Sequence, residues 1–338
     1  MASAVSTLEH GYLRAAPISN VERLLHALGC DPEPVFAKAG VAAPDFLDID
    51  ASIDYVVACR LLEDCALASG CEHFGLLLGQ WFLAHQLGLT WQLAETAPDV
   101  DAALGDIQEF LGLHENGGIV MLHTQGPRVF LGHAIVEPGL TETTTAYDLS
   151  VAVLCIVMRS LCGSAWSPTE VHLSRKRPED VRPYAAFFRA PLNFDMPQSQ
   201  LVFSRRCLAQ PLPKASGANH YLMARAARAA LNARRSGIAL RVRDALRRCL
   251  AAGEPTSATA VAEQLGLHER TLNRRLREEG TSYRQVREGV LRTLSLQYLE
   301  ATQLPVADVA AFLGYGSTAA FDRAFRQWYG ASPTQRRH

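Results

Sequence analysis

Four polar side chains near residue 274 have the types and the spacing that recognise nucleic-acid bases. They occur at positions i, i+3, i+4 and i+7, on one stripe of a helix: Arg270, Asn273, Arg274 and Arg277. Arginine can form two hydrogen bonds with guanine O6 and N7, and asparagine can do the same with adenine. Arg277 stands near the helix end, where we expect a phosphate contact. The alternative is that single arginines form surface ion pairs with the nearby glutamates, which are Glu269, Glu278 and Glu279.

Two segments that repeat at an offset of 48 residues are expected to position such helices. In each, apolar residues at i, i+3, i+4 and i+7 precede a glycine: Ala258, Val261, Ala262, Leu265 and Gly266, then Val306, Val309, Ala310, Leu313 and Gly314. This pattern predicts a short amphipathic helix that ends where a glycine adopts the left-handed conformation. Pro305 suits the start of the second such helix.

A second helix is predicted after each glycine. It reads Leu272-x-Arg274-x-Leu276 in the first copy and Phe321-x-Arg323-x-Phe325 in the second, after a turn that is one residue longer. A helix, a glycine turn and a second helix with basic residues outward are typical of a DNA-reading helix-turn-helix. Because the arrangement occurs twice in one basic region, we favour this interpretation over unrelated helical hairpins.

The second copy presents a different set of outward residues, which are Thr318, Ala319, Asp322, Arg323 and Arg326. Phosphates repel Asp322, and its favourable base partner is a donor such as the cytosine amino group. Asp322 could instead hold Arg326 at i+4. We therefore expect the first copy to supply most of the sequence specificity and the second to anchor the protein through Arg323 and Arg326.

The residues between the two copies predict one continuous helix from Tyr283 to Ala301. Its apolar residues recur every three or four positions: Tyr283, Val286, Val290, Leu294 and Tyr298. At 1.5 Å per residue this helix extends about 28 Å, which approaches one DNA turn of roughly 34 Å. Two reading helices could then enter successive major grooves, so we expect tandem, non-palindromic half-sites.

Charge is unevenly distributed along the 338 residues. Residues 236–338 contain 15 Arg and no Lys against 10 acidic residues, a net charge of +5, which leaves −6 for residues 1–235. This asymmetry favours a polyanion that contacts the C-terminal part, and arginine suits phosphate and guanine better than lysine does. A solvated charged surface is the alternative.

These C-terminal motifs resemble the DNA-binding domain of the AraC/XylS family of transcriptional regulators. The resemblance covers about the last 85 residues and is carried by Gly314-Tyr315, Phe321-Asp322-Arg323-Ala324-Phe325-Arg326, Tyr329-Gly330-Ala331-Ser332-Pro333 and Arg336. It implies an all-α domain with two helix-turn-helix units joined by a long helix, with double-stranded DNA and RNA polymerase as partners. It places base readers at Arg270, Asn273 and Arg274. The sign of regulation, activator or repressor, stays open.

The first two hundred residues predict an α+β domain with a small sheet covered by helices. Helical patterns occur at residues 18–28 and 55–68, and a buried helix is expected at 147–161. Short apolar runs predict strands at 119–123, 129–136, 171–173 and 201–203.

This N-terminal part is similar to the arabinose-binding-type domain of the same family. The similarity spans most of residues 18–212 and is carried by Leu28-Gly-Cys-Asp-Pro32, Phe74-Gly-Leu-Leu-Leu-Gly79, Phe187-Phe-Arg-Ala-Pro-Leu-Asn-Phe194 and Pro211-Leu212. It implies an unknown small-molecule effector, a homodimer, or both. Trp81, His85 and Trp91 could line the effector pocket, although aromatic residues spaced along helices more often fill a core.

We expect three parts: an effector-sensing and dimerisation domain at 1–213, a basic linker at 214–235 and the DNA-binding domain at 236–338. The longest apolar run, Leu149–Met158, is shorter than the roughly 20 residues of a membrane span. Residues 1–10 lack the basic and apolar stretches of a secretion signal. These features favour a cytoplasmic protein without a membrane partner.

No pattern of catalytic, metal-ligating or cofactor-binding residues stands out. The eight cysteines include no Cys-x-x-Cys pair, so we expect buried thiols rather than a metal site. His114, His123 and His133 are scattered over a loop and strands, which leaves a metal triad as an alternative. A DNA-repair enzyme with the same DNA-binding module would carry a Pro-Cys-His-Arg stretch, which is absent here. A constitutive dimeric regulator without a ligand is a further alternative.

Overall fold

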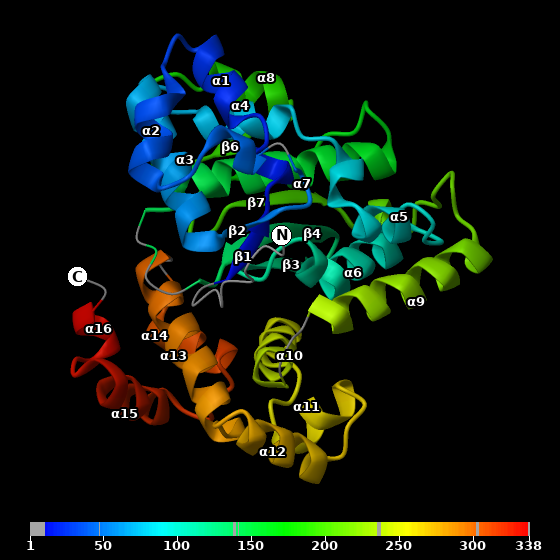
Figure 1. Cartoon of the computed structure of the whole chain (residues 1–338), viewed down its shortest axis with the longest axis vertical. Coiled ribbons are helices and arrows are strands. Elements are labelled where there is room, and N and C mark those ends of the chain that lie inside the picture. The colour runs from blue at the N-terminus through cyan, green and yellow to red at the C-terminus, as the bar shows by residue number, and fades with distance from the viewer. Residues whose placement is uncertain are drawn as a thin grey trace. The chain divides into compact units, whose positions relative to one another are not determined.

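A computed structural model describes residues 11–46, 48–137, 140, 142–234, 238–301 and 304–336. The chain divides into two compact units, Met1–Ala229 and Ala230–His338 (Figure 1). Two sequence-based expectations fall outside the described residues: the domain boundary between residues 235 and 236, and the missing secretion signal at residues 1–10.

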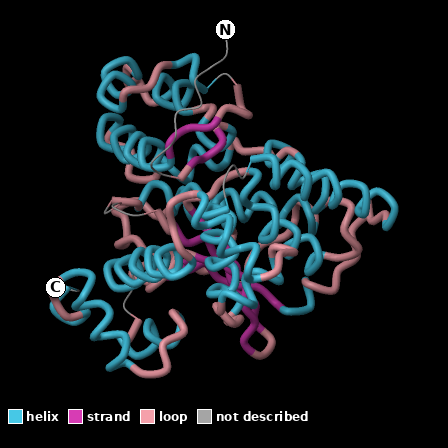
Figure 2. The backbone as a smooth tube through the Cα atoms, turned by 60° about the horizontal axis from the view of Figure 1, so that its bottom comes forward, coloured by secondary structure: helices cyan, strands magenta, loops and turns pink. Residues whose placement is uncertain are grey.

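A five-stranded sheet lies among the helices of the N-terminal unit (Figure 2). Its strands, in spatial order, are β3 (Gly118–Gln125), β4 (Arg128–Ile135), β7 (Gln200–Ser204), β5 (Glu170–His172) and β6 (Leu192–Asn193). Neighbours are antiparallel except for β5 and β6, which are parallel. Side chains alternate between the two faces of a strand. Val129, Leu131 and Phe203 accordingly share one face and are buried in the core with residues of α7 (Thr144–Cys162).

Helix α7 is the central core helix of this unit. Its composition and length would also suit a membrane span, but 61% of that apolar window is buried inside the protein. The sheet strands β4 and β7 pack against it, as do α3 (Tyr55–Ser69) and α4 (Phe74–Gln80). Because neighbours surround the helix, its sequence is apolar on nearly every side.

Two glycines bring α4 close to α7. A Cβ atom at Gly75 would lie 2.0 Å from the Thr145 carbonyl oxygen, and one at Gly79 would lie 2.5 Å from the Ala152 Cβ. Larger residues at these positions would push the helices apart. Helix packing therefore explains the glycine spacing in the Phe74–Gly79 motif.

A second hydrophobic core forms beside the first. It contains residues of the short antiparallel sheet β1 (Tyr12–Arg14) and β2 (Ser52–Asp54), and of the helices α1 (Val21–Ala27), α2 (Pro32–Ala39), α3 and α4. Leu149 of α7 also belongs to this core, whereas Val151 and Ala152 belong to the first. Helix α7 thus joins the two cores.

Four further helices complete the unit: α5 (Leu89–Ala94), α6 (Val100–Phe110), α8 (Arg182–Phe188) and α9 (Gly217–Arg234), the last of which crosses the division between the units. The predicted linker is held to the N-terminal unit by two ion pairs, Lys214–Glu95 at 2.8 Å and Arg228–Glu109 at 2.6 Å, and by a hydrogen bond between His220 and Asp106 at 2.8 Å. Two of its cations are therefore engaged with carboxylates in this structure.

The C-terminal unit is entirely helical. After α10 (Ile238–Ala252) come α11 (Ala258–Gln264), α12 (Glu269–Glu278), α13 (Tyr283–Ala301), α14 (Val306–Phe312), α15 (Thr318–Tyr329) and α16 (Pro333–Arg336). Helices α10, α11 and α12 pack together, and α14, α15 and α16 pack with α13. Because α10 also packs on α13, this helix belongs to both groups.

The predicted fold class is confirmed: a small sheet with helices, followed by an all-α unit with two helix-turn-helix motifs joined by a long helix. The strands at 119–123, 129–136, 171–173 and 201–203 are present within one or two residues. The sequence analysis did not predict β1, β2 or β6, because strands of two or three residues are too short to show a period.

Candidate nucleic-acid interface

The first helix-turn-helix consists of α11 and α12. The Ser257 hydroxyl caps α11 by accepting a hydrogen bond from the Ala260 amide at 3.1 Å. In the turn, Gly266 has a φ of +64°, the left-handed conformation that glycine adopts without strain. Leu272 and Leu276 are fully buried, as predicted, so the opposite face of α12 points to solvent.

The second helix-turn-helix, α14 and α15, repeats this construction. Gly314 has a φ of +74°, and the Ser317 hydroxyl accepts a hydrogen bond from the Ala320 amide at 3.2 Å. Phe321 and Phe325 are fully buried in the positions of the two leucines. The turn is one residue longer than in the first copy, as predicted.

Helix α13 is bonded to both hairpins. At its N-terminal end the Tyr283 hydroxyl donates to the Thr256 carbonyl oxygen at 2.9 Å, just before α11. Further along, the Trp328 indole N–H of α15 donates to Glu288 Oε1 at 2.9 Å. The helix has 19 residues, or about 28 Å. Its predicted bounds, Tyr283 to Ala301, are those of the structure.

The outward face of α12 carries the predicted base readers. Arg270, Arg274 and Arg277 are exposed, and Asn273 is half-buried. No ion pair involves Arg270 or Arg277 among the residues that the structure describes. These two guanidinium groups are thus available to an anionic ligand.

The three nearby glutamates do not neutralise this stripe. Glu269 accepts a hydrogen bond from the Thr259 hydroxyl at 2.7 Å, and Glu279 accepts from the Ala239 amide at 2.9 Å at the start of α10. Only Glu278 approaches an arginine of the stripe, at 3.7 Å from Arg274, and both side chains are exposed. Surface ion pairing therefore explains at most one of the arginines.

Helix α15 presents the second predicted set. Thr318, Ala319, Arg323 and Arg326 are exposed, and Asp322 is half-buried. The expected pair between Asp322 and Arg326 is present, with 3.0 Å between Oδ2 and Nε. An aspartate that is already paired with its own helix offers less negative charge to a phosphate. The structure thus gives α15 fewer free base-reading groups than α12.

The three residues considered for an effector pocket do not come together. His85 and Trp91 border one open groove, together with Leu212 and Lys214. Trp91 is only 8% exposed and belongs to the first core, so packing is its main role. Trp81 lies outside this groove and stacks with the Arg23 guanidinium, 4.8 Å from the ring centroid.

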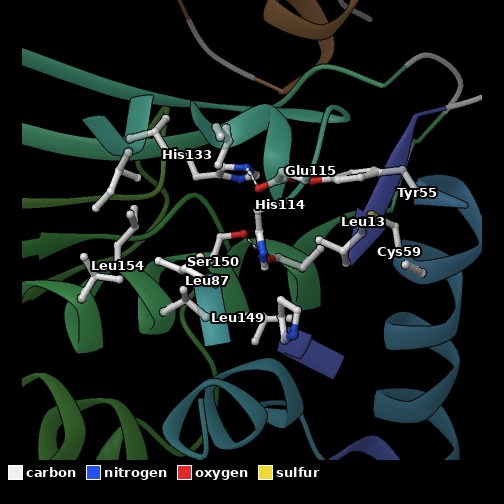
Figure 3. Close-up of a pocket in the computed structure, with 18 of the residues that line it drawn as sticks. Leu13, Tyr55, Cys59, Leu87, His114, Glu115, His133, Leu149, Ser150 and Leu154 are labelled. Atoms are coloured by element: carbon white, nitrogen blue, oxygen red, sulfur yellow. Dashed lines mark hydrogen bonds and ion pairs between the residues drawn. The ribbon is translucent and has the colours of Figure 1, made fainter. Parts of the chain in front are cut away.

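A partly open cavity, which was not predicted from the sequence, lies where the two cores meet (Figure 3). Its polar lining includes Tyr55, Glu115 and His133, which come from α3, from the residues before β3 and from β4. Of the three histidines considered for a metal triad, His133 and His123 lie on different faces of the sheet, because the His123 ring stacks on Phe130 with 4.6 Å between the ring centroids. No group of three metal-ligating side chains occurs among the described residues. No sequence period indicates this cluster, because its members meet only through long-range packing.

The fold and this surface define a class of protein: an α+β domain joined to a duplicated helix-turn-helix with an arginine-rich outer face. Comparison with known families finds the same two domains. Residues 29–212 match the arabinose-binding domain of AraC transcription regulators, and residues 261–338 match a helix-turn-helix domain. The chain belongs to the AraC family of transcriptional regulators.

Relatives align along nearly the whole chain. The ornithine utilization regulator of Pseudomonas aeruginosa is 31% identical over 330 residues, which are 95% of this chain and 96% of the relative. The transcriptional regulator VirS of Mycobacterium tuberculosis is 26% identical over 327 residues, 96% of each chain. The crystal structure of CdpR from Pseudomonas aeruginosa has 23% identity and a TM-score of 0.45, covering 90% of this chain and 96% of CdpR. The family and these relatives are transcriptional regulators, not enzymes.

Proposed function

We propose that this regulator binds two tandem half-sites on one face of a DNA duplex, with α12 reading bases and α15 contacting mainly phosphates. The observation that carries the proposal is the outward stripe of α12. Arg270, Arg274 and Arg277 are exposed on a helix whose other side is locked by two buried leucines. Such a helix presents its arginine donors at fixed positions, as base recognition in a major groove requires.

In the first helix-turn-helix, Arg270, Asn273 and Arg274 would contact base edges, and Arg277 would contact a phosphate. Arg323 and Arg326 would anchor α15, with Thr318 and Ala319 near the backbone and Asp322 holding Arg326. The length of α13, about 28 Å, suits reading helices that enter successive grooves. The half-sites would then follow one another in the same orientation.

The N-terminal unit would sense a small molecule. Helix α6 lies between the cavity and the connecting helix: Ile107 lines the cavity, while Asp106 holds α9 through a hydrogen bond and Glu109 holds it through an ion pair. An effector that shifts α6 would therefore change the position of α9. Such a ligand changes DNA binding only if it binds one of the two arrangements more tightly.

We assign residues 1–213 to effector sensing and dimerisation, 214–235 to the connection and 236–338 to DNA binding. A homodimer, contact with RNA polymerase and a cytoplasmic location complete the proposal.

The test is to select DNA fragments with the purified full-length protein and to sequence them. We expect a bipartite motif in direct repeat, bound with an affinity that falls steeply as the salt concentration rises. A palindromic motif would contradict the tandem arrangement, and the absence of salt-sensitive binding would contradict the proposed role of the arginine stripe.

A further inference from the structure

The cavity in the N-terminal unit is a partly open, mainly apolar space. It measures about 70 Å³, where a water molecule needs roughly 10–15 Å³. Apolar side chains from several elements line it, among them Leu13, Leu62, Leu87, Ile107, Leu149 and Leu154. This space is large enough for several waters or for the body of a small organic molecule, and its walls favour the latter.

One wall of the cavity is polar. Figure 3 shows Tyr55, Glu115 and His133 in a row, with His114 below Glu115 and with Leu87, Leu149 and Leu154 across from the row. His133 Nε2 lies 2.9 Å from Glu115 Oε1, and the two residues are only 4% and 7% exposed. This pair is therefore almost completely removed from bulk solvent.

Two glycines make room for these side chains. A Cβ atom at Gly117 would lie 2.2 Å from the Tyr55 ring, and one at Gly118 would lie 2.1 Å from His133 Nε2. Any other residue would displace the ring or break the His133–Glu115 pair. The polar wall is thus built into the start of β3.

The Tyr55 hydroxyl also interacts with the Glu115 carboxylate. Among the described residues, Glu115 Oε2 and His133 Nδ1 nevertheless have no hydrogen-bond partner of ordinary geometry. Burial alone would raise the pKa of Glu115, but the neighbouring His133 outweighs it, and the pKa lies below its ordinary value. The carboxylate is therefore ionised and accepts the Nε2–H of His133.

A buried carboxylate oxygen such as Glu115 Oε2 requires a donor. We propose that the cavity is the effector site and that it takes a small apolar molecule with one hydrogen-bond-donating head group, an amine or a hydroxyl, placed against Glu115 and His133. This inference rests on the proposed role of the N-terminal unit as a sensor. A carboxylate head would be repelled by Glu115, because opposing charges attract and like charges repel strongly where water is excluded. A sugar would leave most of its hydroxyl groups against leucine side chains without partners.

The probes are four compounds added to the full-length protein during thermal unfolding: hexylamine, 1-hexanol, hexanoate and L-arabinose. The first three are unbranched and contain six carbon atoms each, and they present an ammonium, a hydroxyl and a carboxylate head group. We expect hexylamine or 1-hexanol to raise the unfolding midpoint saturably, by roughly 3 °C at ten times its dissociation constant. Hexanoate and arabinose should leave the midpoint unchanged. No shift with either donor compound, or an equal shift with hexanoate, would overturn the inference.

Two matched variants on α7 locate the site. Ser150 lines the cavity, whereas Ser160 borders the open groove near His85, and each hydroxyl donates to the carbonyl four residues earlier, at 2.8 Å and 2.9 Å. Ser150→Leu should abolish the shift by filling the cavity, and Ser160→Leu should preserve it. The reverse pattern would place the ligand in the groove and refute the assignment. If Ser150→Leu does not fold, Ala58→Leu fills the same cavity from α3.

Glu115→Gln tests the polar wall. It should weaken hexylamine binding at least tenfold, because the charge that attracts the ammonium group is gone, and affect 1-hexanol less. Unchanged hexylamine affinity would show that the head group lies elsewhere. Salt-dependent DNA binding is measured on the same samples. If DNA binding is intact while no probe binds, this inference alone fails; if wild-type protein does not bind DNA, the proposed function fails.

Discussion

Replacing Arg274 by alanine tests the division of labour between the two reading helices. In the free protein this guanidinium is 68% exposed and has one weak partner, Glu278 at 3.7 Å. An exposed i,i+4 pair of this kind contributes only about 0.3–0.5 kcal/mol, so breaking it on binding to DNA costs little free energy. A bidentate contact with guanine contributes about 1–3 kcal/mol of discrimination, which corresponds to roughly 5- to 150-fold in affinity.

We therefore expect Arg274→Ala to lower the affinity for the preferred site by roughly 5- to 150-fold and to relax base preference at one position of the first half-site. The folded state should be nearly unaffected, because the side chain is exposed and makes no core contact. The matched control is Arg323→Ala on α15. It should weaken binding by a similar factor on all sequences and reduce the salt dependence by about one counterion.

The assay combines selection from a randomised DNA pool with fluorescence anisotropy at several salt concentrations. If Arg274→Ala left base preference intact while Asp322→Ala abolished it, the second hairpin would carry the specificity, which would refute the proposed roles.

Three further predictions concern stability. Leu276→Ala, in the buried core of the first hairpin, should lower the free energy of unfolding of the C-terminal unit by about 2–5 kcal/mol in urea titrations; a cost under 1 kcal/mol would argue against close packing there. Gly314→Ala places a side chain at a φ of +74° and should cost roughly 1 kcal/mol by the same titration, whereas Gly289→Ala, inside α13, should cost nothing. Burial raises the pKa of Asp148 to about 6, against the pull of Arg175 at 2.6 Å. Since the native state then retains a proton that the unfolded state has lost, stability should fall as pH rises from about 4 to 6, and Asp148→Asn should remove that fall; an identical pH profile for both proteins would contradict the assignment.

The two hairpins of the C-terminal unit and the helix between them could be predicted from the sequence, whereas α10 and α16 were not. The hairpin helices are amphipathic, their turns contain Gly266 and Gly314 in the left-handed conformation, and the inner residues of both reading helices are buried as their spacing predicts. Local patterns suffice here because each hairpin is formed by residues close together in the chain. The outward stripe follows from the same periodicity, since one face of a helix fixes the other.

The N-terminal unit could be predicted only in part. The sequence indicated a sheet with helices, but Glu115 and His133 meet through strand pairing and packing that no period encodes. Trp81 and Trp91 are close in sequence, yet one stacks on Arg23 and the other fills the core. Chemistry built from distant residues is visible only once the packing is known.

The central claim is that α13 fixes both reading helices in register with one DNA duplex. The most direct measurement is the affinity of the full-length protein for its selected site after five base pairs are inserted between the half-sites. The insertion turns one half-site to the opposite face of the duplex, about half a helical turn away. We expect affinity to fall to that of a single half-site. Undiminished affinity would show that the two hairpins are not rigidly coupled, which contradicts the account.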